Sequence, residues 1–132
     1  MTVGLKKLGL QDEGNLIRAM AALGGGIASS GGPCGALTGG IALLGRLFGK
    51  IDPEEKDDPR MWKAAFKFYK MFQSEICGEK GSVDCRDIAC VDWRDREAAA
   101  GFYGGEGRLV CGGNTGRAAG ILGEVIDRYL EG

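Results

Sequence analysis

The chain has 132 residues, a formal net charge of −1 and no histidine. This length predicts a single domain over residues 1–132 with a hydrophobic core of its own. The balanced charge and the dispersed basic residues exclude the electrostatic footprint of a protein that binds nucleic acid or anionic membranes. Without histidine, the chain has no His-dependent catalytic triad, His-containing zinc site or His-ligated haem, so thiolates or carboxylates must hold any metal.

The sequence also predicts the compartment, and with it the chemistry of the cysteines. No apolar run reaches the roughly 18 residues of a membrane span, and residues 1–7 lack the apolar segment of a signal peptide. We therefore expect a cytoplasmic protein that binds neither membrane nor nucleic acid. The chain has five cysteines, and stable structural disulfides are rare in the cytosol. Buried inert thiols, metal ligands and redox thiols are the alternatives.

The first two predicted helices flank a glycine-rich loop. Residues 11–23 carry apolar side chains at helical spacing, and three consecutive glycines at 24–26 end that helix. Residues 29–33, Ser-Ser-Gly-Gly-Pro, predict a loop. A second helix begins near Gly35 or Ala36 and runs to Phe48. Its predicted apolar stripe consists of Leu37, Ile41, Leu44 and Phe48.

The middle of the chain predicts an amphipathic helix. Asp58 is a good N-cap, and Pro59 suits the first helical position. Lysines cover one face of this helix, and an aromatic stripe predicts the core face. That face is predicted to contain Trp62, Ala65, Phe66, Tyr69 and Phe72 or Phe68.

The remaining elements are shorter until the last one. We expect a helical turn around residues 85–88, a helix over 94–102, a glycine-rich turn over 104–107 and a final helix over about 114–129. The inward residues of the final helix are predicted to be Ala118, Leu122, Val125, Ile126 and Tyr129. Sustained period-two alternation is absent from the sequence. The predicted fold class is therefore all-α, a compact bundle of four to five helices with glycine-rich connecting loops.

Cys34 and Cys111 each open a copy of the hexapeptide pattern C-G-x-x-T-G. Each copy precedes an apolar, helix-like run, so both cysteines are predicted at helix N-termini. There the backbone N–H groups and the helix dipole lower the pKa of a thiol. Gly35 and Gly112 would let backbone amides approach the sulfur or a bound cofactor closely. The two halves of the chain do not otherwise align, and we interpret the second copy as a coincidental echo.

Cys77, Cys85 and Cys90 lie between these two motifs. The sequence has no C-x2-C pair, which disfavours rubredoxin-like, zinc-ribbon and thioredoxin-like sites. The C-x4-C spacing of Cys85 and Cys90 matches only part of the plant-type ferredoxin pattern. Three of the five cysteines fall in glycine-rich or polar turns. A purely structural role for all five is therefore disfavoured.

The segment from the glycines at 24–26 to residues 34–39, Cys-Gly-Ala-Leu-Thr-Gly, resembles the C-G-A-x-x-G motif of the C_GCAxxG_C_C family of redox-active proteins. The resemblance covers roughly residues 16–130 and continues through residues 85–88 and Cys111. A related domain occurs in split-Soret cytochromes, which carry an iron–sulfur cluster beside haem. The resemblance implies a helical domain whose cysteines ligate an iron–sulfur cluster or undergo thiol redox chemistry.

Three family cysteines have counterparts in this chain, and the resemblance implies Cys34, Cys85 and Cys111 as ligands. The family's first cysteine, upstream of the glycine-rich segment, has no counterpart here. Cys90, which stands where the family pattern leads us to expect glycine, or Cys77 would then be the fourth ligand. A site with three thiolates and an open position, and a site without metal, are the other two interpretations.

The sequence thus predicts a small redox protein that binds an iron–sulfur cluster of unspecified nuclearity and passes electrons to a redox partner protein. It favours an electron carrier or accessory protein over a stand-alone enzyme. One alternative is a metal-free thiol–disulfide protein in which Cys85 or Cys90 pairs with Cys34 or Cys111. Another is a structural zinc adaptor. Apolar surface on the aromatic-rich helix also makes a homodimer an expected assembly.

Overall fold

The computed structural model describes residues 1–10, 12–79 and 81–132. Within these ranges it contains seven α-helices, one 3-10 helix and no named β-strand. They are α1 (Thr2–Lys7), α2 (Gly14–Ala19), the 3-10 helix η1 (Ala21–Leu23), α3 (Gly35–Phe48), α4 (Pro59–Ile76), α5 (Cys85–Ala89), α6 (Arg96–Gly104) and α7 (Gly107–Leu130). The all-α class is confirmed, whereas the helices outnumber the four to five predicted. None of the described helices is long and apolar enough to cross a bilayer.

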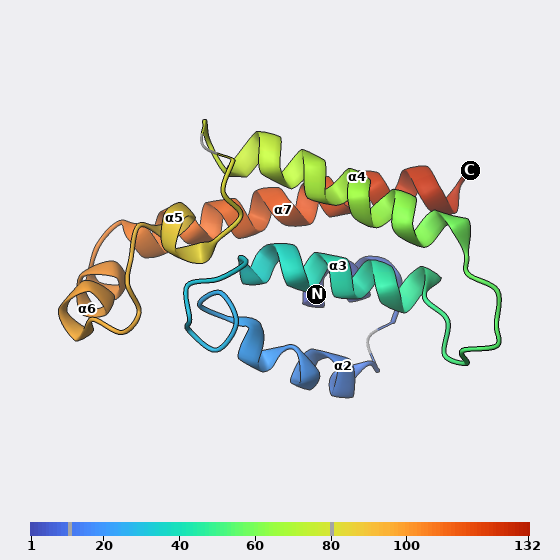
Figure 1. Ribbon diagram of the computed structural model, residues 1–132, viewed down its shortest axis with the longest axis horizontal. Helices are drawn as coiled ribbons and strands as arrows, with labels where there is room; N and C mark the ends of the chain where they lie inside the picture. The colour runs from blue at the N-terminus through green and yellow to red at the C-terminus, as the bar shows by residue number, and fades with distance from the viewer. Residues whose placement is uncertain (11, 80) are drawn as a thin grey trace.

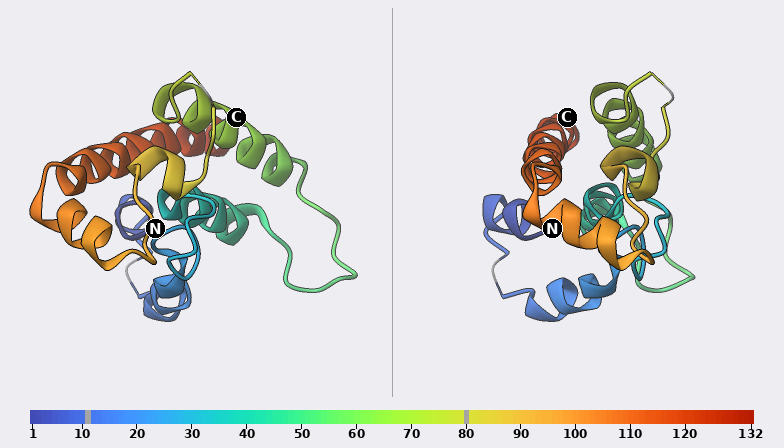
Figure 2. Two further views of the ribbon diagram at one scale, coloured as in Figure 1. Left: turned by 60° about the vertical axis from the view of Figure 1, so that its left-hand side comes forward. Right: turned by 90° about the vertical axis from the view of Figure 1, so that its left-hand side faces the viewer.

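The core lies between α3, α4 and α7, each of which packs against the other two (Figure 1). Figure 2 shows α2 on the side of α3 that faces away from α4. The rings of Phe68 and Phe72 meet edge to face, with centroids 6.3 Å apart, and α1 contributes Leu5 to the core. The fully buried side chains of the three long helices are Leu43, Leu44, Ala64, Phe68, Phe72, Ile121, Val125 and Ile126.

The start of α4 agrees with the prediction, but its core face does not. The Asp58 carboxylate accepts a hydrogen bond from the Arg60 backbone N–H at 2.8 Å, which caps the helix. The buried residues of α4 are Ala64, Phe68 and Phe72, one helical turn apart. Trp62 and Phe66, predicted to be core residues, are 69% and 68% exposed. The helix has two apolar stripes, which the prediction combined into one core face. In the structure, α3 and α7 cover only the stripe of the buried residues, and the other stripe faces solvent.

The boundaries of two other predicted helices also change. The predicted helix over 11–23 ends early, because α2 stops at Ala19 and η1 follows it; its first predicted residue, Gln11, lies outside the described residues. The last helix begins at Gly107 instead of near Asn114. Six of the residues of α7 are glycines, among them Gly112, Gly113 and Gly116, and a glycine inside a helix is about 1 kcal/mol less favourable than alanine. The predicted start near residue 114 is therefore too late, because these glycines lower helix propensity without ending the helix.

The loop between η1 and α3 is unusual, because five consecutive residues have left-handed backbone angles. From Gly25 to Ser29, φ lies between +53° and +73°. Ile27 and Ala28 are among these residues, and a left-handed conformation costs an L-residue roughly 1–2 kcal/mol. Backbone hydrogen bonds hold the turn, including Ala28 N–H to Ala22 O at 2.7 Å. The sequence predicts a loop here but not its handedness.

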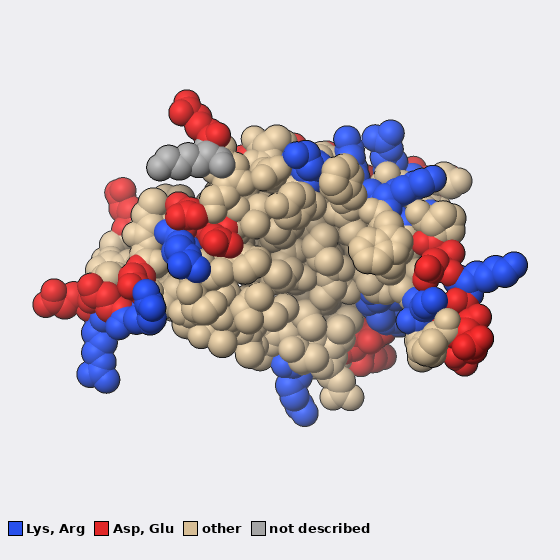
Figure 3. Space-filling view, viewed as in Figure 1, with Lys and Arg blue, Asp and Glu red and all other residues tan. Residues whose placement is uncertain are grey.

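Charged side chains gather toward the ends of the face shown in Figure 3, while the middle of that face is largely uncharged. Two exposed aromatic residues of α4, Trp62 and Phe66, add apolar surface to the molecule. Such surface is compatible with association, and the homodimer stays a prediction.

Two glycines of α3 provide a matched test of how closely it packs against α4. A Cβ on Gly40 would lie 2.6 Å from Cζ of the fully buried Phe68 ring, whereas a Cβ on Gly45 would meet no described atom within 4 Å. Gly40→Ala should lower the free energy of unfolding by about 1–3 kcal/mol through overpacking. Gly45→Ala should raise it by up to about 1 kcal/mol through helix propensity. Urea denaturation of both variants measures the difference, and equal effects would contradict this packing.

Candidate functional site

The cysteines gather at one end of the core, where α3 begins, α4 ends and α5 packs against α7 (Figure 1). All five lie within the described ranges and are free thiols. Cys34 is the N-cap of α3, and Cys85 is the first residue of α5. Cys77 follows α4, and Cys90 follows α5. The structure thus brings together residues from four separate stretches of the sequence.

The glycine-rich loop joins Cys34 to Cys85. The backbone N–H of Cys34 donates to Val83 O at 2.8 Å, and that of Cys85 donates to Gly32 O at 2.6 Å. A Cβ on Gly26 would lie 2.8 Å from the Cβ of Cys85, closer than real Cβ atoms approach, so the loop needs glycine at that position. The left-handed turn therefore fixes the start of α5 against the start of α3, and with it the relative positions of the two cysteines.

Cys111 does not lie at a helix N-terminus as predicted, because α7 begins at Gly107 and Cys111 is inside it. Burial raises the pKa of the Cys111 thiol, and repulsion from Cys34 and then Cys85 raises it further; a hydrogen bond with Thr115 opposes the rise. The prediction of a lowered pKa at Cys111 is therefore wrong. The placement of Cys34 at a helix start is confirmed. The two C-G-x-x-T-G copies share only a local feature, the Thr hydroxyl that donates to the Cys carbonyl one turn earlier.

Cys34 is electrostatically central among the thiols. Burial raises the pKa of Cys77 and of Cys85, and in each case the neighbouring Cys34 raises it further. The Trp93 indole N–H donates to Cys85 Sγ at 3.4 Å, which opposes the rise at Cys85. One cysteine therefore acts on three others, and three of the thiols hold their protons more firmly than free cysteine does.

A mostly apolar cavity of about 220 Å³ opens between α3, α5 and α7, and three cysteines line it. We call it the three-cysteine cavity; its sulfur-bearing residues are Cys34, Cys90 and Cys111. The apolar residues of its wall include Phe72, Ile88, Ala89 and Val110. A mostly apolar space of this kind shields a bound group from water. Besides the three cysteines, its polar side chains are those of Asn114 and Thr115.

The two glycines predicted to contact a cofactor, Gly35 and Gly112, are not among the lining residues of the three-cysteine cavity. A Cβ on Gly35 would approach the Leu23 carbonyl oxygen at 2.9 Å, so Gly35 allows α3 to pack against η1. Gly112 lies on an open part of α7, where an added Cβ would meet no described atom within 4 Å. Contact of these two glycines with a cofactor stays a prediction. In the structure, Gly35 serves the close packing of α3 against η1.

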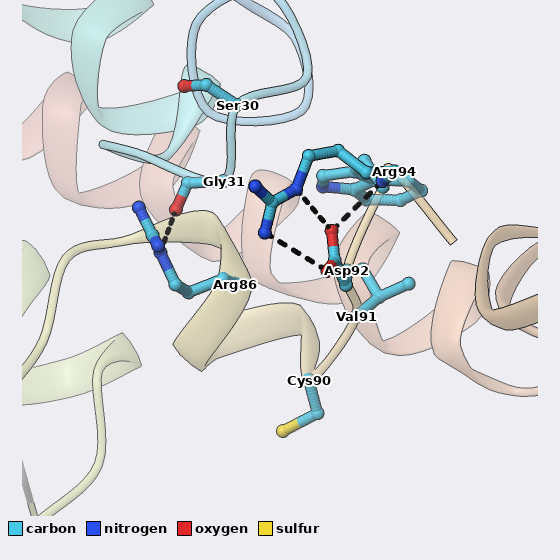
Figure 4. Close-up of a pocket in the computed structure, with 8 residues that line it drawn as sticks. Ser30, Gly31, Arg86, Cys90, Val91, Asp92 and Arg94 are labelled. Atoms are coloured by element: carbon cyan, nitrogen blue, oxygen red, sulfur yellow. Dashed lines mark hydrogen bonds and ion pairs between the residues drawn. The ribbon is translucent and has the colours of Figure 1, made fainter. Parts of the chain in front are cut away.

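A second pocket of about 280 Å³ lies on the other side of Cys90 and contains two arginines (Figure 4). Arg86 donates from Nε to Gly31 O at 3.0 Å, and Arg94 pairs with Asp92 at 3.1 Å. Arg86 thus ties α5 to the glycine-rich loop, and Arg94 ties the segment after α5 to itself. In Figure 4, the Cys90 sulfur points away from these groups. Cys90 has φ 54° and ψ 43°, a left-handed geometry more usual for glycine.

The spacing of the thiols distinguishes between kinds of metal site. Across residues 1–10, 12–79 and 81–132, no three Cys, Asp or Glu side chains are grouped so that they could hold a metal ion. A tetrahedral zinc site needs its ligands to meet at one ion, with Zn–S distances of about 2.3 Å. The observed arrangement therefore fits a single-ion zinc site poorly.

Trp93 is the site residue that the sequence did not single out. The sequence of residues 92–95, Asp-Trp-Arg-Asp, is compatible with a partner-facing segment and equally with a capped helix start, and Asp95 does cap α6. A tryptophan eight positions after a cysteine is not a recognisable pattern in itself. Only the fold brings its indole to Cys85.

The helical fold and the clustered thiols define a cysteine-rich helical protein. A family model described as "Putative redox-active protein (C_GCAxxG_C_C)" matches residues 1–125. The chain belongs to this family. No curated protein and no solved structure matches it.

Proposed function

We propose that this protein binds an iron–sulfur cluster through Cys34, Cys85, Cys111 and Cys90 and carries electrons to a partner oxidoreductase. The three-cysteine cavity is the observation that carries the proposal, because it places three thiols from separate elements around one apolar space. Cys85 joins this set through its repulsion with both Cys34 and Cys111. Membership of a redox family supports the same reading.

The donor set suits a cluster better than a single ion. Iron–sulfur clusters are held by cysteine thiolates, and each thiolate binds its own iron atom, so the ligands surround a volume. That requirement matches thiols spread around a cavity but not grouped at one point. When bound, such a cluster supplies one-electron transfer.

The residues of this chain would hold and shield the cluster. Phe72, Ile88 and Val110 supply apolar wall that limits solvent access, which together with hydrogen bonds to sulfur sets the potential of such centres. The raised pKa values mean that Cys77, Cys85 and Cys111 carry protons when free. Ligation by Cys85 and Cys111 therefore releases protons, and loading should be more complete above neutral pH than below it.

Cys90 is favoured over Cys77 as the fourth ligand. Cys90 lines the three-cysteine cavity with Cys34 and Cys111, and its sulfur points away from the arginine-containing pocket (Figure 4). Cys77, in contrast, is not among the residues that line this cavity.

Anaerobic reconstitution with iron and sulfide tests the proposal. We expect visible absorbance with about stoichiometric iron and sulfide, lost or strongly reduced in Cys90→Ser and retained in Cys77→Ser. Both variants remove one thiol outside the family pattern, so they form a matched pair. A colourless, metal-free product would rule out the cluster, and loss in Cys77→Ser alone would reassign the fourth ligand.

A thiol–disulfide protein is the second candidate, and the proximity of Cys34 to three other thiols favours it. Two thiols would form one S–S bond and give up two protons and two electrons to an external oxidant. The raised pKa values of Cys77, Cys85 and Cys111 work against rapid exchange, since the thiolate is the reactive form. A reversible loss of two free thiols in metal-free protein, with no cluster on reconstitution, would favour this candidate.

A further inference from the structure

Cys85 has a side-chain hydrogen-bond partner that comes from outside the core. The Trp93 indole N–H donates to Cys85 Sγ at 3.4 Å. Cys85 is 8% exposed and Trp93 is half-buried, so the contact is largely shielded from water. The thiols of Cys77 and Cys90, in contrast, donate to backbone carbonyl oxygens of Phe72 and Asp87. The Cys85 sulfur therefore accepts a hydrogen bond from a side chain, whereas the Cys77 and Cys90 thiols donate to the backbone.

Aromatic side chains of α6 hold the indole in place. The Trp93 ring meets Phe102 at 4.9 Å between centroids and 77° between planes, and Tyr103 lies 5.9 Å away. Such edge-to-face pairs stabilise the contact beyond what the burial of their area alone provides. A Cβ on Gly107 would lie 2.7 Å from Phe102 Cδ2, so the start of α7 packs tightly against this ring.

These aromatic contacts suggest a role for α6, which contributes no buried residue to the core. The structure describes every residue of α6, and none of them is buried. The helix is nonetheless firmly started, because the Asp95 carboxylate accepts from the backbone N–H groups of Glu97 and Ala98. Its visible contribution is to carry Phe102 and Tyr103 to Trp93.

We infer that Trp93, held by the aromatic residues of α6, is a positioning residue that orients Cys85 Sγ and tunes the redox centre through its N–H···S hydrogen bond. A donor to sulfur stabilises negative charge there, and hydrogen bonds to sulfur are one of the factors that set cluster potentials. Loss of the donor should therefore make the reduced cluster less stable. This consequence rests on the proposed function, whereas the Trp93–Cys85 contact itself does not.

Fluorescence of metal-free protein tests the contact. The chain has two tryptophans, so the Trp62→Phe background leaves Trp93 as the sole tryptophan, and a neighbouring thiol quenches indole emission. Cys85→Ala in that background should raise Trp93 emission, whereas the matched Cys77→Ala should leave it unchanged. Phe102→Leu keeps Cys85 but removes the ring that packs against Trp93. It should therefore shift Trp93 emission in the same direction as Cys85→Ala. Unchanged emission in both Cys85→Ala and Phe102→Leu would overturn the inference.

The potential of reconstituted protein tests the tuning. Trp93→Phe keeps the ring but removes the donor, and it should shift the midpoint potential to a more negative value; Trp62→Phe is the control. Far-UV circular dichroism and the melting temperature of Trp93→Phe should stay close to wild type, which separates tuning from loss of structure. An unchanged potential would overturn the tuning. If no cluster forms, the proposed function fails while the fluorescence result still decides on the contact.

Discussion

Cys34→Ser is expected to abolish cluster formation more completely than any other single cysteine substitution. Cys34 caps α3, lines the three-cysteine cavity and lies close enough to three other thiols to raise their pKa values. Loss of a residue that only supports a ligand typically costs 10–100-fold in metal affinity, so loss of the central ligand should cost at least roughly 100-fold. Iron and sulfide content after anaerobic reconstitution, with visible absorbance, measures the effect.

Cys77→Ser is the matched control for this substitution. Cys77 is also half-buried and also interacts with Cys34, but it lies at the end of α4 with its thiol directed to the Phe72 carbonyl. It should retain the cluster, and both variants should keep the helical circular dichroism of the parent. Reconstitution of Cys34→Ser to the parent's level would show that the site does not centre on this cysteine.

The sequence predicted the parts of the fold that local rules decide. The Asp58-Pro59 start of α4 and the turn at Cys85 follow from capping and helix propensity. The inner face of α7, including Leu122 and Ile126, follows from helical periodicity. The all-α class needed no more than this information.

The sequence could not decide features that depend on the partners of each helix. Trp62 and Phe66 form an apolar stripe on α4 that is as regular as the stripe of the buried residues. Only the packing of α3 and α7 decides which of the two stripes is buried. The length of α7 was hidden by its glycines, which lower helix propensity without ending the helix. The error in this boundary also explains why the predicted direction of the pKa shift at Cys111 is wrong: the prediction places Cys111 at a helix N-terminus, whereas it lies inside α7.

In the candidate site, too, the sequence reveals the residue types, whereas the packing of the elements decides which residues meet. The five cysteines could be read directly, and the resemblance implied which three belong to a family pattern. Their convergence depends on the left-handed loop, where Ile27 and Ala28 adopt backbone angles that no propensity rule assigns to them. The Trp93 contact depends on the placement of α6.

Gly26→Ala should be among the most destabilising single substitutions outside the core. Gly26 has φ +73°, and an added Cβ would lie 2.6 Å from Gly32 N and 2.8 Å from Cys85 Cβ. The left-handed angle contributes about 1–2 kcal/mol of strain and overpacking about 1–3 kcal/mol, so the free energy of unfolding should fall by about 2–5 kcal/mol. Chemical denaturation measures the loss.

Gly24→Ala, two residues earlier in the same loop, is the matched control for Gly26→Ala. Gly24 has φ −62°, and an added Cβ would meet no described atom within 4 Å. This substitution should leave stability unchanged or raise it by up to about 1 kcal/mol, because alanine restricts the unfolded chain. The loop fixes Cys85 against Cys34, so Gly26→Ala should also reduce cluster loading, and Gly24→Ala should not. Normal stability and loading in Gly26→Ala would mean that the left-handed turn does not position the two cysteines.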